Sequence, residues 1–404
     1  MAVIVAAFSV AIVVTTEFIV VGILPILARD LEISVSQAGQ FVSWHAFAAA
    51  VVGSPLTILS SRIAPHRVLA VVLLLFALGN LAVVLVPEYP LIAAARVVQG
   101  AALPVFIATA TAAVARLAAP GAAGRAIAGV NIGVVVATVF AVPAGVIMAD
   151  MAGWSANFIA LAALAGLAAL TIAALFPRMS NAGLADMADQ AAILLRPRFQ
   201  AHLALSAILF VGMFAAYTYL AAFLEGVAGF ESRQTSLALM GFGFAGLTGN
   251  WAAGLVVDRA PLAATAGVAA ILTMALAASS LAGGHLWSLL PILGVWGAAH
   301  TAAFIICHVR TMLAAPQAPA FAGALNISVS NLGVALGALA GGWTIERFGL
   351  EAAGWGGASF ATLTFVMALL LSMAANDDRN ARVSKFTARA HSSRADPGGD
   401  PSKS

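Results

Sequence analysis

Long apolar runs joined by short polar connections dominate the chain. Each run has about the length a helix needs to cross the roughly 30 Å hydrocarbon core of a bilayer, and charges inside the runs are rare. The alternating segments of about ten residues that mark a transmembrane β-barrel are not found. The pattern predicts an all-α membrane protein with twelve transmembrane helices, at residues 3–28, 35–58, 68–87, 90–115, 126–149, 154–176, 201–225, 235–257, 262–283, 286–313, 320–345 and 352–374.

The connections divide these spans into two groups of six. The longest internal connection, 177–200, separates a predicted N-terminal bundle (1–176) from a C-terminal bundle (201–375), and we expect it to be a cytoplasmic linker. The last segment, 376–404, is polar and contains Gly, Pro and Ser, so it is predicted to be a disordered cytoplasmic tail.

The two groups of six spans also resemble each other in sequence. Phe106 recurs as Phe304, Asn131 as Asn326 and Arg62 as Arg259, each displaced by about 195 to 198 residues. Such a constant displacement predicts two pseudo-symmetric halves related by a duplication, with a binding site between them near the middle of the bilayer.

Composition supports a membrane protein and excludes several functions. Of the 404 residues, 62% are hydrophobic and 9% are charged, too few charges for a soluble surface. The sequence has no P-loop, dinucleotide fingerprint, zinc-protease pair or nucleophile elbow, so we expect neither an enzyme nor a bound cofactor. The single cysteine, Cys307, has no metal-ligand spacing around it and is interpreted as a small buried hydrophobic residue.

The distribution of Lys and Arg predicts the orientation. With both termini in the cytoplasm, fifteen basic residues lie inside, and only Arg29, Arg233 and Arg347 lie outside. This asymmetry explains the sequence pI of about 9.5 without a nucleic-acid partner. His308 and Arg310, near the cytoplasmic end of their span, are expected to be interfacial.

Three short motifs carry a family resemblance. They are Thr16-Glu17-Phe18 with the following Gly22 and Pro25 in the first span, Arg96-Val97-Val98-Gln99-Gly100 in the fourth, and Gly254 with Asp258-Arg259 after the eighth. With these motifs the chain resembles the major facilitator superfamily, and within it the twelve-span drug:proton antiporters that export sugars, nucleosides or chloramphenicol from bacteria. The resemblance implies a monomeric, multi-pass protein of the bacterial inner membrane.

The resemblance also implies a conformational gate formed by the loop motifs, with Arg62 and Arg67 in the first half and Asp258 and Arg259 in the second. The first-half copy departs from the family pattern, because Thr57, Ser61 and Ala64 stand where Gly, Asp and Gly are usual. In the fifth span the antiporter motif is reduced to Gly133 and Val142-Pro143-Ala144-Gly145.

Two ionisable residues inside spans are the first candidates for function. Glu17 lies near the middle of the first span, where a charged carboxylate costs several kcal/mol, and Arg96 lies in the fourth. One interpretation is that Glu17 exchanges the coupled proton while Arg96 tunes it or receives an anionic substrate group; the other is a fixed structural ion pair. His300 is a further proton-coupling candidate, and His45 a weaker one, although a lone buried histidine is more often only hydrogen-bonded.

Substrate contacts are predicted on two spans. Gln99 shares a helix face with Arg96 in the fourth span, and Phe210, Phe214 and Tyr217 form an aromatic stripe in the seventh. The stripe suits an apolar drug-like ligand, while simple helix packing explains it equally well. Glycines at four-residue spacing, Gly333, Gly337 and Gly341, are interpreted with Gly145 as helix-packing positions.

These observations predict a secondary transporter that exports small organic molecules in exchange for protons by alternating access. Its partners are then a small-molecule substrate, protons and the lipid bilayer. Uptake by a proton symporter or facilitator is the alternative within transport, because composition does not set the order of coupling. A membrane sensor or an intramembrane enzyme is the alternative outside it, but the sequence contains neither an additional soluble domain nor a catalytic cluster.

Overall fold

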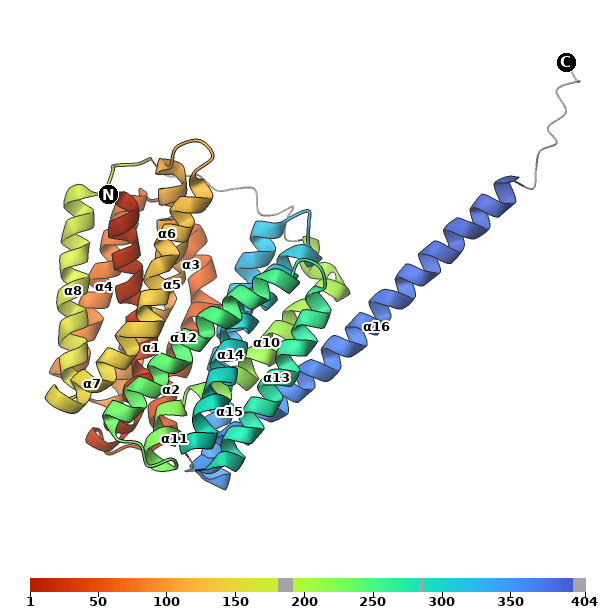
Figure 1. Cartoon of the computed structure of the whole chain (residues 1–404). Helices are drawn as coiled ribbons and strands as arrows, with labels where there is room; N and C mark the ends of the chain where they lie inside the picture. Colours follow the sequence, from red (N-terminus) through yellow and green to blue (C-terminus); the bar gives the residue numbers. More distant parts are fainter. Residues whose placement is uncertain (181–191, 284–285, 395–404) are drawn as a thin grey trace, which may run out of the picture.

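The computed structural model describes residues 1–180, 192–283 and 286–394, and these residues form helices and the turns between them (Figure 1). The helices of the first half are α1 (Ala2–Asp30), α2 (Val35–Ala48), η1 (Ala49–Gly53), α3 (Ser54–Ser60), α4 (Pro65–Leu85), α5 (Tyr89–Leu117), α6 (Ala123–Val136), η2 (Ala137–Ala141), α7 (Val142–Ala152) and α8 (Trp154–Leu175). Those of the second half are η3 (Ala192–Leu195), α10 (Pro197–Tyr217), α11 (Leu220–Gly226), α12 (Ser232–Val256), α13 (Pro261–Ala282), α14 (Leu286–Ala314), α15 (Pro319–Phe348), η4 (Leu350–Ala352) and α16 (Ala353–Arg394).

The helices make up twelve long segments, which agrees with the all-α prediction. Within the described residues, eleven segments are long and apolar enough to cross a membrane. The twelfth, α12, has 25 residues and contains several polar residues in its first turns. It corresponds to the span expected at 235–257.

Three of the spans are interrupted along their length. The second and fifth contain one turn of π-helix each, η1 and η2, and each turn is followed by a Pro at the start of the next α-helix. A π-turn and a proline both break the regular hydrogen-bond ladder and bend a helix. The seventh span is broken between α10 and α11, at Thr218 and Tyr219.

The spans form two bundles that meet along three contacts. α2 with η1 packs against α15, α7 with η2 packs against α12, and α1 packs against α11. Hydrogen bonds cross the contact where Ser232 donates to Asp150 (3.0 Å) and where Ser236 donates to the carbonyl of Pro143 (2.8 Å). The hydroxyls of Ser54 and Ser328 share a further hydrogen bond of 2.5 Å.

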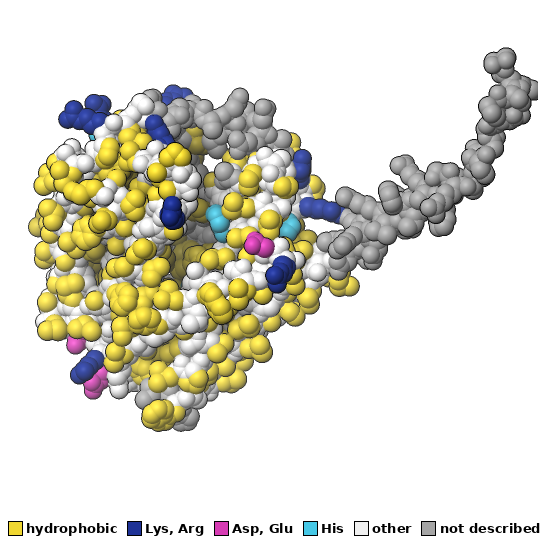
Figure 2. Space-filling view, turned by 45° about the horizontal axis from the view of Figure 1, so that its top comes forward, with side chains coloured by type: hydrophobic (Ala, Val, Ile, Leu, Met, Phe, Trp, Pro, Cys, Tyr) yellow, Lys and Arg dark blue, Asp and Glu magenta, His cyan; other side chains and the backbone are white. Residues whose placement is uncertain are grey.

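The two ends of the molecule differ in how tightly the halves meet. We call the end that carries Arg62, Arg67, Arg125 and Arg259 the basic end; the N-terminus also lies there (Figure 1). The surface is hollowed between the halves at this end, with basic and histidine side chains around the hollow (Figure 2). At the opposite end the hydrogen bonds of Asp150 and Pro143 hold the halves together. The structure is therefore open toward the basic end.

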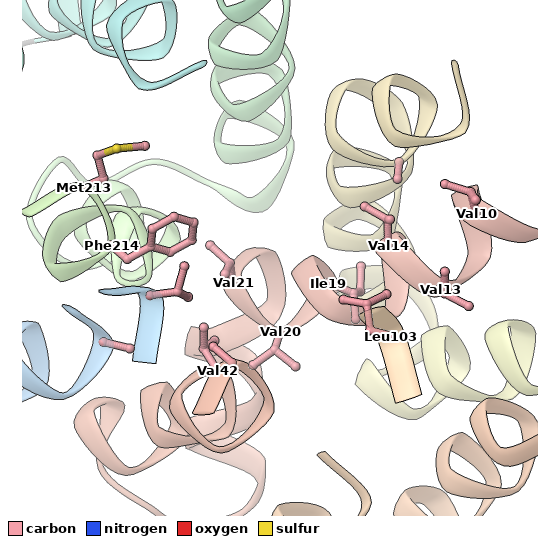
Figure 3. Packing of buried hydrophobic residues seen from close by; sticks show 14 of the residues in the cluster. Val10, Val13, Val14, Ile19, Val20, Val21, Val42, Leu103, Met213 and Phe214 are labelled. Carbon is pink, nitrogen blue, oxygen red and sulfur yellow. The ribbon is translucent and has the colours of Figure 1, made fainter. Parts of the chain in front are cut away.

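One large hydrophobic cluster runs through both halves, and it includes Val20 and Val21 of α1 as well as Met213 and Phe214 of α10. Figure 3 shows part of it, with Phe214 facing α1. Glycines permit the closest helix approaches. A side chain on Gly333, Gly337 or Gly341 would meet the backbone of α10, and one on Gly145 would meet Ile19 of α1.

The structure describes only part of the expected linker and part of the expected C-terminal tail. Residues 181–191 of the expected linker and residues 395–404 of the expected tail lie outside the described residues. The last helix, α16, continues from the final span as far as Arg394, so helix occupies most of the segment in which the sequence predicts disorder. That segment contains several Ala, Arg and Lys residues, which have high helix propensity.

Candidate functional site

The candidate site lies where Phe18 of α1 in the first half faces Phe214 of α10 in the second, beside Phe304 of α14. Glu17 and Phe18 come from α1, and both are partly exposed. Tyr217 at the end of α10 is also partly exposed, and Phe304 of α14 is 38% exposed. Phe18 stacks on Phe214 at a ring-centroid distance of 6.4 Å, so the site joins the two halves.

The aromatic stripe predicted on the seventh span is part of a larger cluster. Phe214 stacks on Phe210 at 6.3 Å and meets the ring of Tyr217 edge-on at 5.6 Å. Phe304 meets Phe210 edge-on at 4.7 Å. Since Phe210 and Phe214 are buried, they form the wall behind Phe304 and Tyr217 and hold these rings in place.

Sequence reasoning missed two members of this cluster, Phe242 of α12 and Trp296 of α14. Phe242 stacks on Tyr217 at 5.4 Å and meets Trp296 edge-on at 5.6 Å. Trp296 lies four residues before His300, on the same face of α14, so helical spacing was a signal that could have found it.

His300 lies in the centre of this cluster. Its ring is 4.6 Å from that of Tyr217 and between 5.4 and 5.7 Å from those of Phe214, Phe242 and Phe304. The side chain is 5% exposed, and its Nδ1 atom has no hydrogen-bond partner. The structure thus places His300 beside the other candidates, in an environment of aromatic rings.

Arg96 is fully buried and donates mainly to backbone carbonyls. Its Nη1 and Nη2 atoms donate to the carbonyls of Thr16 (2.6 Å) and Glu17 (2.8 Å) in α1, and its Nε atom donates to that of Phe41 (3.3 Å) in α2. No nitrogen of Arg96 lies within 4.0 Å of a carboxylate oxygen of Glu17. Arg96 therefore fixes the backbone that carries Glu17, and the Glu17 carboxyl has no ion pair with any residue that the structure describes.

Gln99 lies in the same buried network. It donates to Asn80 (2.9 Å), and Asn80 donates to Thr16 (3.4 Å). Gln99 and Asn80 are both 0% exposed. In this conformation Gln99 joins three helices of the first half to each other.

Arg310 differs from its sequence prediction. It was expected at the interface, but it is 0% exposed inside the second half. Its Nη2 atom donates to Ser206 (2.6 Å) and to the carbonyl of His202 (2.9 Å), and Ser206 donates in turn to Asn326 (2.8 Å). Its span has no clear amphipathic pattern, so the sequence did not indicate that the face carrying Arg310 is buried. The arginine joins α10, α14 and α15 much as Arg96 joins the helices of the first half.

The gate candidates lie at the basic end. Arg62 occupies the turn between α3 and α4, and Arg67 lies in the first turn of α4. Asp258 and Arg259 occupy the turn between α12 and α13, and all four side chains are exposed. They therefore lie around the end at which the halves are apart.

The remaining candidates are buried. His45 is 1% exposed with no hydrogen-bond partner for either ring nitrogen, and Cys307 is a buried free thiol. In the part of the chain that the structure describes, no group of three or more His, Cys, Asp or Glu residues is arranged to hold a metal ion.

Comparison with known proteins identifies the family. Residues 6–328 match the family model of the Major Facilitator Superfamily. A chloramphenicol resistance protein of Streptomyces lividans is 31% identical over 337 residues, covering 82% of this chain and 86% of that protein. The inner membrane transport protein YdhP of Escherichia coli K12 is 29% identical, covering 82% of this chain and 85% of that one.

A solved structure of the nucleoside transporter NupG has a TM-score of 0.74 at 13% identity and covers 91% of this chain and 99% of NupG, which shows a shared fold. Two helical bundles and a family match over most of the chain define a membrane transporter. The chain belongs to the Major Facilitator Superfamily and is a multi-pass membrane transporter of small molecules, not an enzyme.

Proposed function

We propose that this transporter exports small organic molecules in exchange for protons, and that Glu17 carries the coupled proton. The basic end then faces the cytoplasm of a bacterial cell, and the structure is the inward-open state of an alternating-access cycle. Phe210, Phe214 and Tyr217 form the substrate site with Phe18 and Phe304, while Gln99 and Arg96 hold the first half around it.

The observation that carries this proposal is the position of Glu17. It is a carboxyl group inside a span, partly exposed and beside an aromatic cluster at the contact of the halves. A charged group inside a membrane is costly, and such groups usually serve function. Because Arg96 donates its hydrogen bonds elsewhere, the Glu17 carboxyl is available to a proton or a ligand. The name of the Streptomyces lividans relative supports export as the direction.

A flux experiment tests the proposal. Cells with and without the protein are loaded with chloramphenicol, a nucleoside or a sugar, and accumulation is measured with and without an uncoupler. We expect lower accumulation of at least one compound in cells that contain the protein, and loss of that difference when the uncoupler removes the proton gradient. Higher accumulation that depends on the gradient would instead indicate a proton symporter for uptake.

Reporter fusions test the orientation. The proposal requires that fusions after Arg67, Arg198 and Arg382 report a cytoplasmic location, while one near Glu88 reports a periplasmic location, because Lys and Arg concentrate at the basic end. Alkaline phosphatase and a fluorescent protein provide opposite signals at each position. A periplasmic signal after Arg198 would contradict the arrangement of six spans followed by six.

A substitution at Asp258 tests the proposed conformational gate at the basic end. Because it lies in an exposed turn at the open end, we expect Asp258→Asn to slow the conformational cycle without weakening substrate binding in the inward-open state. Turnover in vesicles and equilibrium binding to purified protein distinguish the two effects, with Glu351→Asn at the opposite end as the control. Weaker binding at unchanged turnover would show that Asp258 acts on the substrate and not on the gate.

A further inference from the structure

A cavity of about 540 Å³ lies between the two halves at the end opposite the basic end, and we call it the closed-end cavity. The first half lines it with the last turns of α1 and the start of α2, and the second half with α11 and η4. Arg29, Ser34 and Gly226 in its lining are exposed, so the cavity opens to the surface. Its volume is in the range of small-molecule sites.

The closed-end cavity is separate from the candidate site and differs from it in chemistry. From Glu17 to Ala28 the rise along α1 is about 16 Å, and none of the candidate-site residues lines the cavity. Much of the lining is aliphatic, and no aromatic ring is among the lining residues that the structure describes; the aliphatic side chains are those of Pro25, Ala28, Val35, Ala222 and Leu350. Such a surface suits a compact saturated hydrocarbon group, which gains free energy by leaving water.

Glu225 of α11 gives the cavity an unpaired acceptor. Its Oε1 atom is buried and has no hydrogen-bond partner among the described residues. Arg29 and Asp150 both interact with Glu225 electrostatically, but Arg29 is exposed and its Nε atom donates to Asp30 (2.9 Å). A buried acceptor without a partner is costly, and a ligand that supplies a donor removes this cost. Because Arg29 is already paired and Asp150 adds a second carboxylate nearby, a cationic donor fits better than an anion.

We propose that the closed-end cavity binds small molecules with a compact saturated hydrocarbon body and an ammonium group, and that a bound molecule holds this end of the transporter closed. The ammonium group donates to the Oε1 atom of Glu225, and the hydrocarbon body packs against the aliphatic lining. Both halves form the cavity, so it exists only while they meet at this end. A ligand that binds one of two conformations shifts the equilibrium toward it. Such a molecule therefore inhibits transport without occupying the candidate site.

A matched ligand series tests the chemistry of the cavity on the purified, unchanged protein. The probes are 1-adamantylmethylammonium, the neutral 1-adamantylmethanol and the anionic 1-adamantanecarboxylate, which share one saturated cage, and the measurement is calorimetric titration near neutral pH. A hydrogen bond between an ammonium and a carboxylate is roughly twice as strong as a neutral one, so we expect the ammonium to bind about tenfold more tightly than the alcohol. The carboxylate should show no binding. Binding of the carboxylate as tight as that of the ammonium would overturn the proposal.

Variants assign the binding to the closed-end cavity. Glu225→Gln should remove the preference for the ammonium over the alcohol while preserving alcohol binding, and Leu350→Ala should weaken both ligands by a similar factor. Glu346→Gln is the matched control, because Glu346 is an exposed carboxyl of the second half at the same end and does not line the cavity. Glu17→Gln should also leave the preference unchanged. A preference that survives in Glu225→Gln, or one that disappears in Glu17→Gln, would contradict the assigned position of the ligand.

Cysteine labelling tests whether the bound ammonium holds this end closed. Ser36 of α2 is 6% exposed and lies against Gly342 of the second half, so a cysteine introduced there, in a Cys307→Ala background, reacts with an alkylating reagent when the halves separate. At ten times its Kd the ammonium should slow labelling about tenfold, because a ligand of the closed form lowers the open fraction by that factor. The carboxylate at the same concentration should have no effect. An unchanged labelling rate with bound ammonium would overturn the proposal that the ligand holds the halves together.

Discussion

Glu17→Gln should abolish the accumulation of a neutral substrate driven by a pH gradient, while exchange of that substrate down its own gradient continues. Glutamine has nearly the shape of glutamate but binds no proton near neutral pH. A proton that binds the two conformations equally, or not at all, cannot bias the equilibrium between them. The substrate gradient still can, so downhill exchange should remain close to that of the unchanged protein.

The structure also predicts that this variant folds. If Glu17 served only as the ion-pair partner of Arg96, its removal would leave a buried charge and cost about 3 to 5 kcal/mol. Arg96 instead donates to the backbone carbonyls of Thr16, Glu17 and Phe41, which the substitution retains. We therefore expect a Tm close to that of the unchanged protein.

Purified protein in vesicles with an imposed pH gradient provides the measurement. Uphill accumulation in the Glu17→Gln vesicles should fall to that of protein-free vesicles, and Glu351→Gln, an exposed carboxyl at the opposite end, should behave like the unchanged protein. Retained uphill accumulation in Glu17→Gln would exclude Glu17 as the required proton carrier and direct attention to His300.

The span positions could be predicted because the length and apolar character of a transmembrane helix are local properties of the chain. The run at 235–257, for example, corresponds to α12 at Ser232–Val256. The aromatic stripe of Phe210, Phe214 and Tyr217 was also visible, since helical spacing alone places these residues close together. The division into two similar halves could be predicted as well, because residues of the first half recur in the second at a nearly constant displacement along the chain.

The partners of the polar residues could not be predicted in the same way. Helices that are apolar on all sides give no periodic signal, so the sequence does not show which face packs against which neighbour. Arg96 donates to carbonyls about 80 residues earlier in the chain, and Arg310 donates to Ser206, 104 residues away. Backbone carbonyls have no sequence signature, so the sequence left both interpretations of Glu17 and Arg96 open, a proton-exchanging carboxyl and a fixed ion pair.

The contact between Gly39 and Tyr219 shows how the end opposite the basic end closes. Gly39 of α2 belongs to the first half, and Tyr219 belongs to the second, where its hydroxyl donates to the carbonyl of Ala338 (2.7 Å). Tyr219 is 0% exposed. A side-chain carbon on Gly39 would overlap the hydroxyl and ring of Tyr219, so the halves meet this closely only because residue 39 is glycine.

Gly39→Ala should therefore shift the transporter away from the inward-open state and slow transport. Overpacking costs about 1 to 3 kcal/mol, and such an energy shifts an equilibrium between two conformations by about 5- to 150-fold. Folding of each half should persist, because the overlap exists only where the halves meet.

Alkylation of a cysteine introduced at Ser36, in a Cys307→Ala background, measures how often the end opposite the basic end opens. We expect faster labelling in Gly39→Ala. Tyr219→Ala should restore transport in the Gly39→Ala protein by removing the overlapping ring, whereas Gly267→Ala, which points into open space, should change neither labelling nor transport. Unchanged labelling and transport in Gly39→Ala would show that the halves close at this end without the contact between Gly39 and Tyr219.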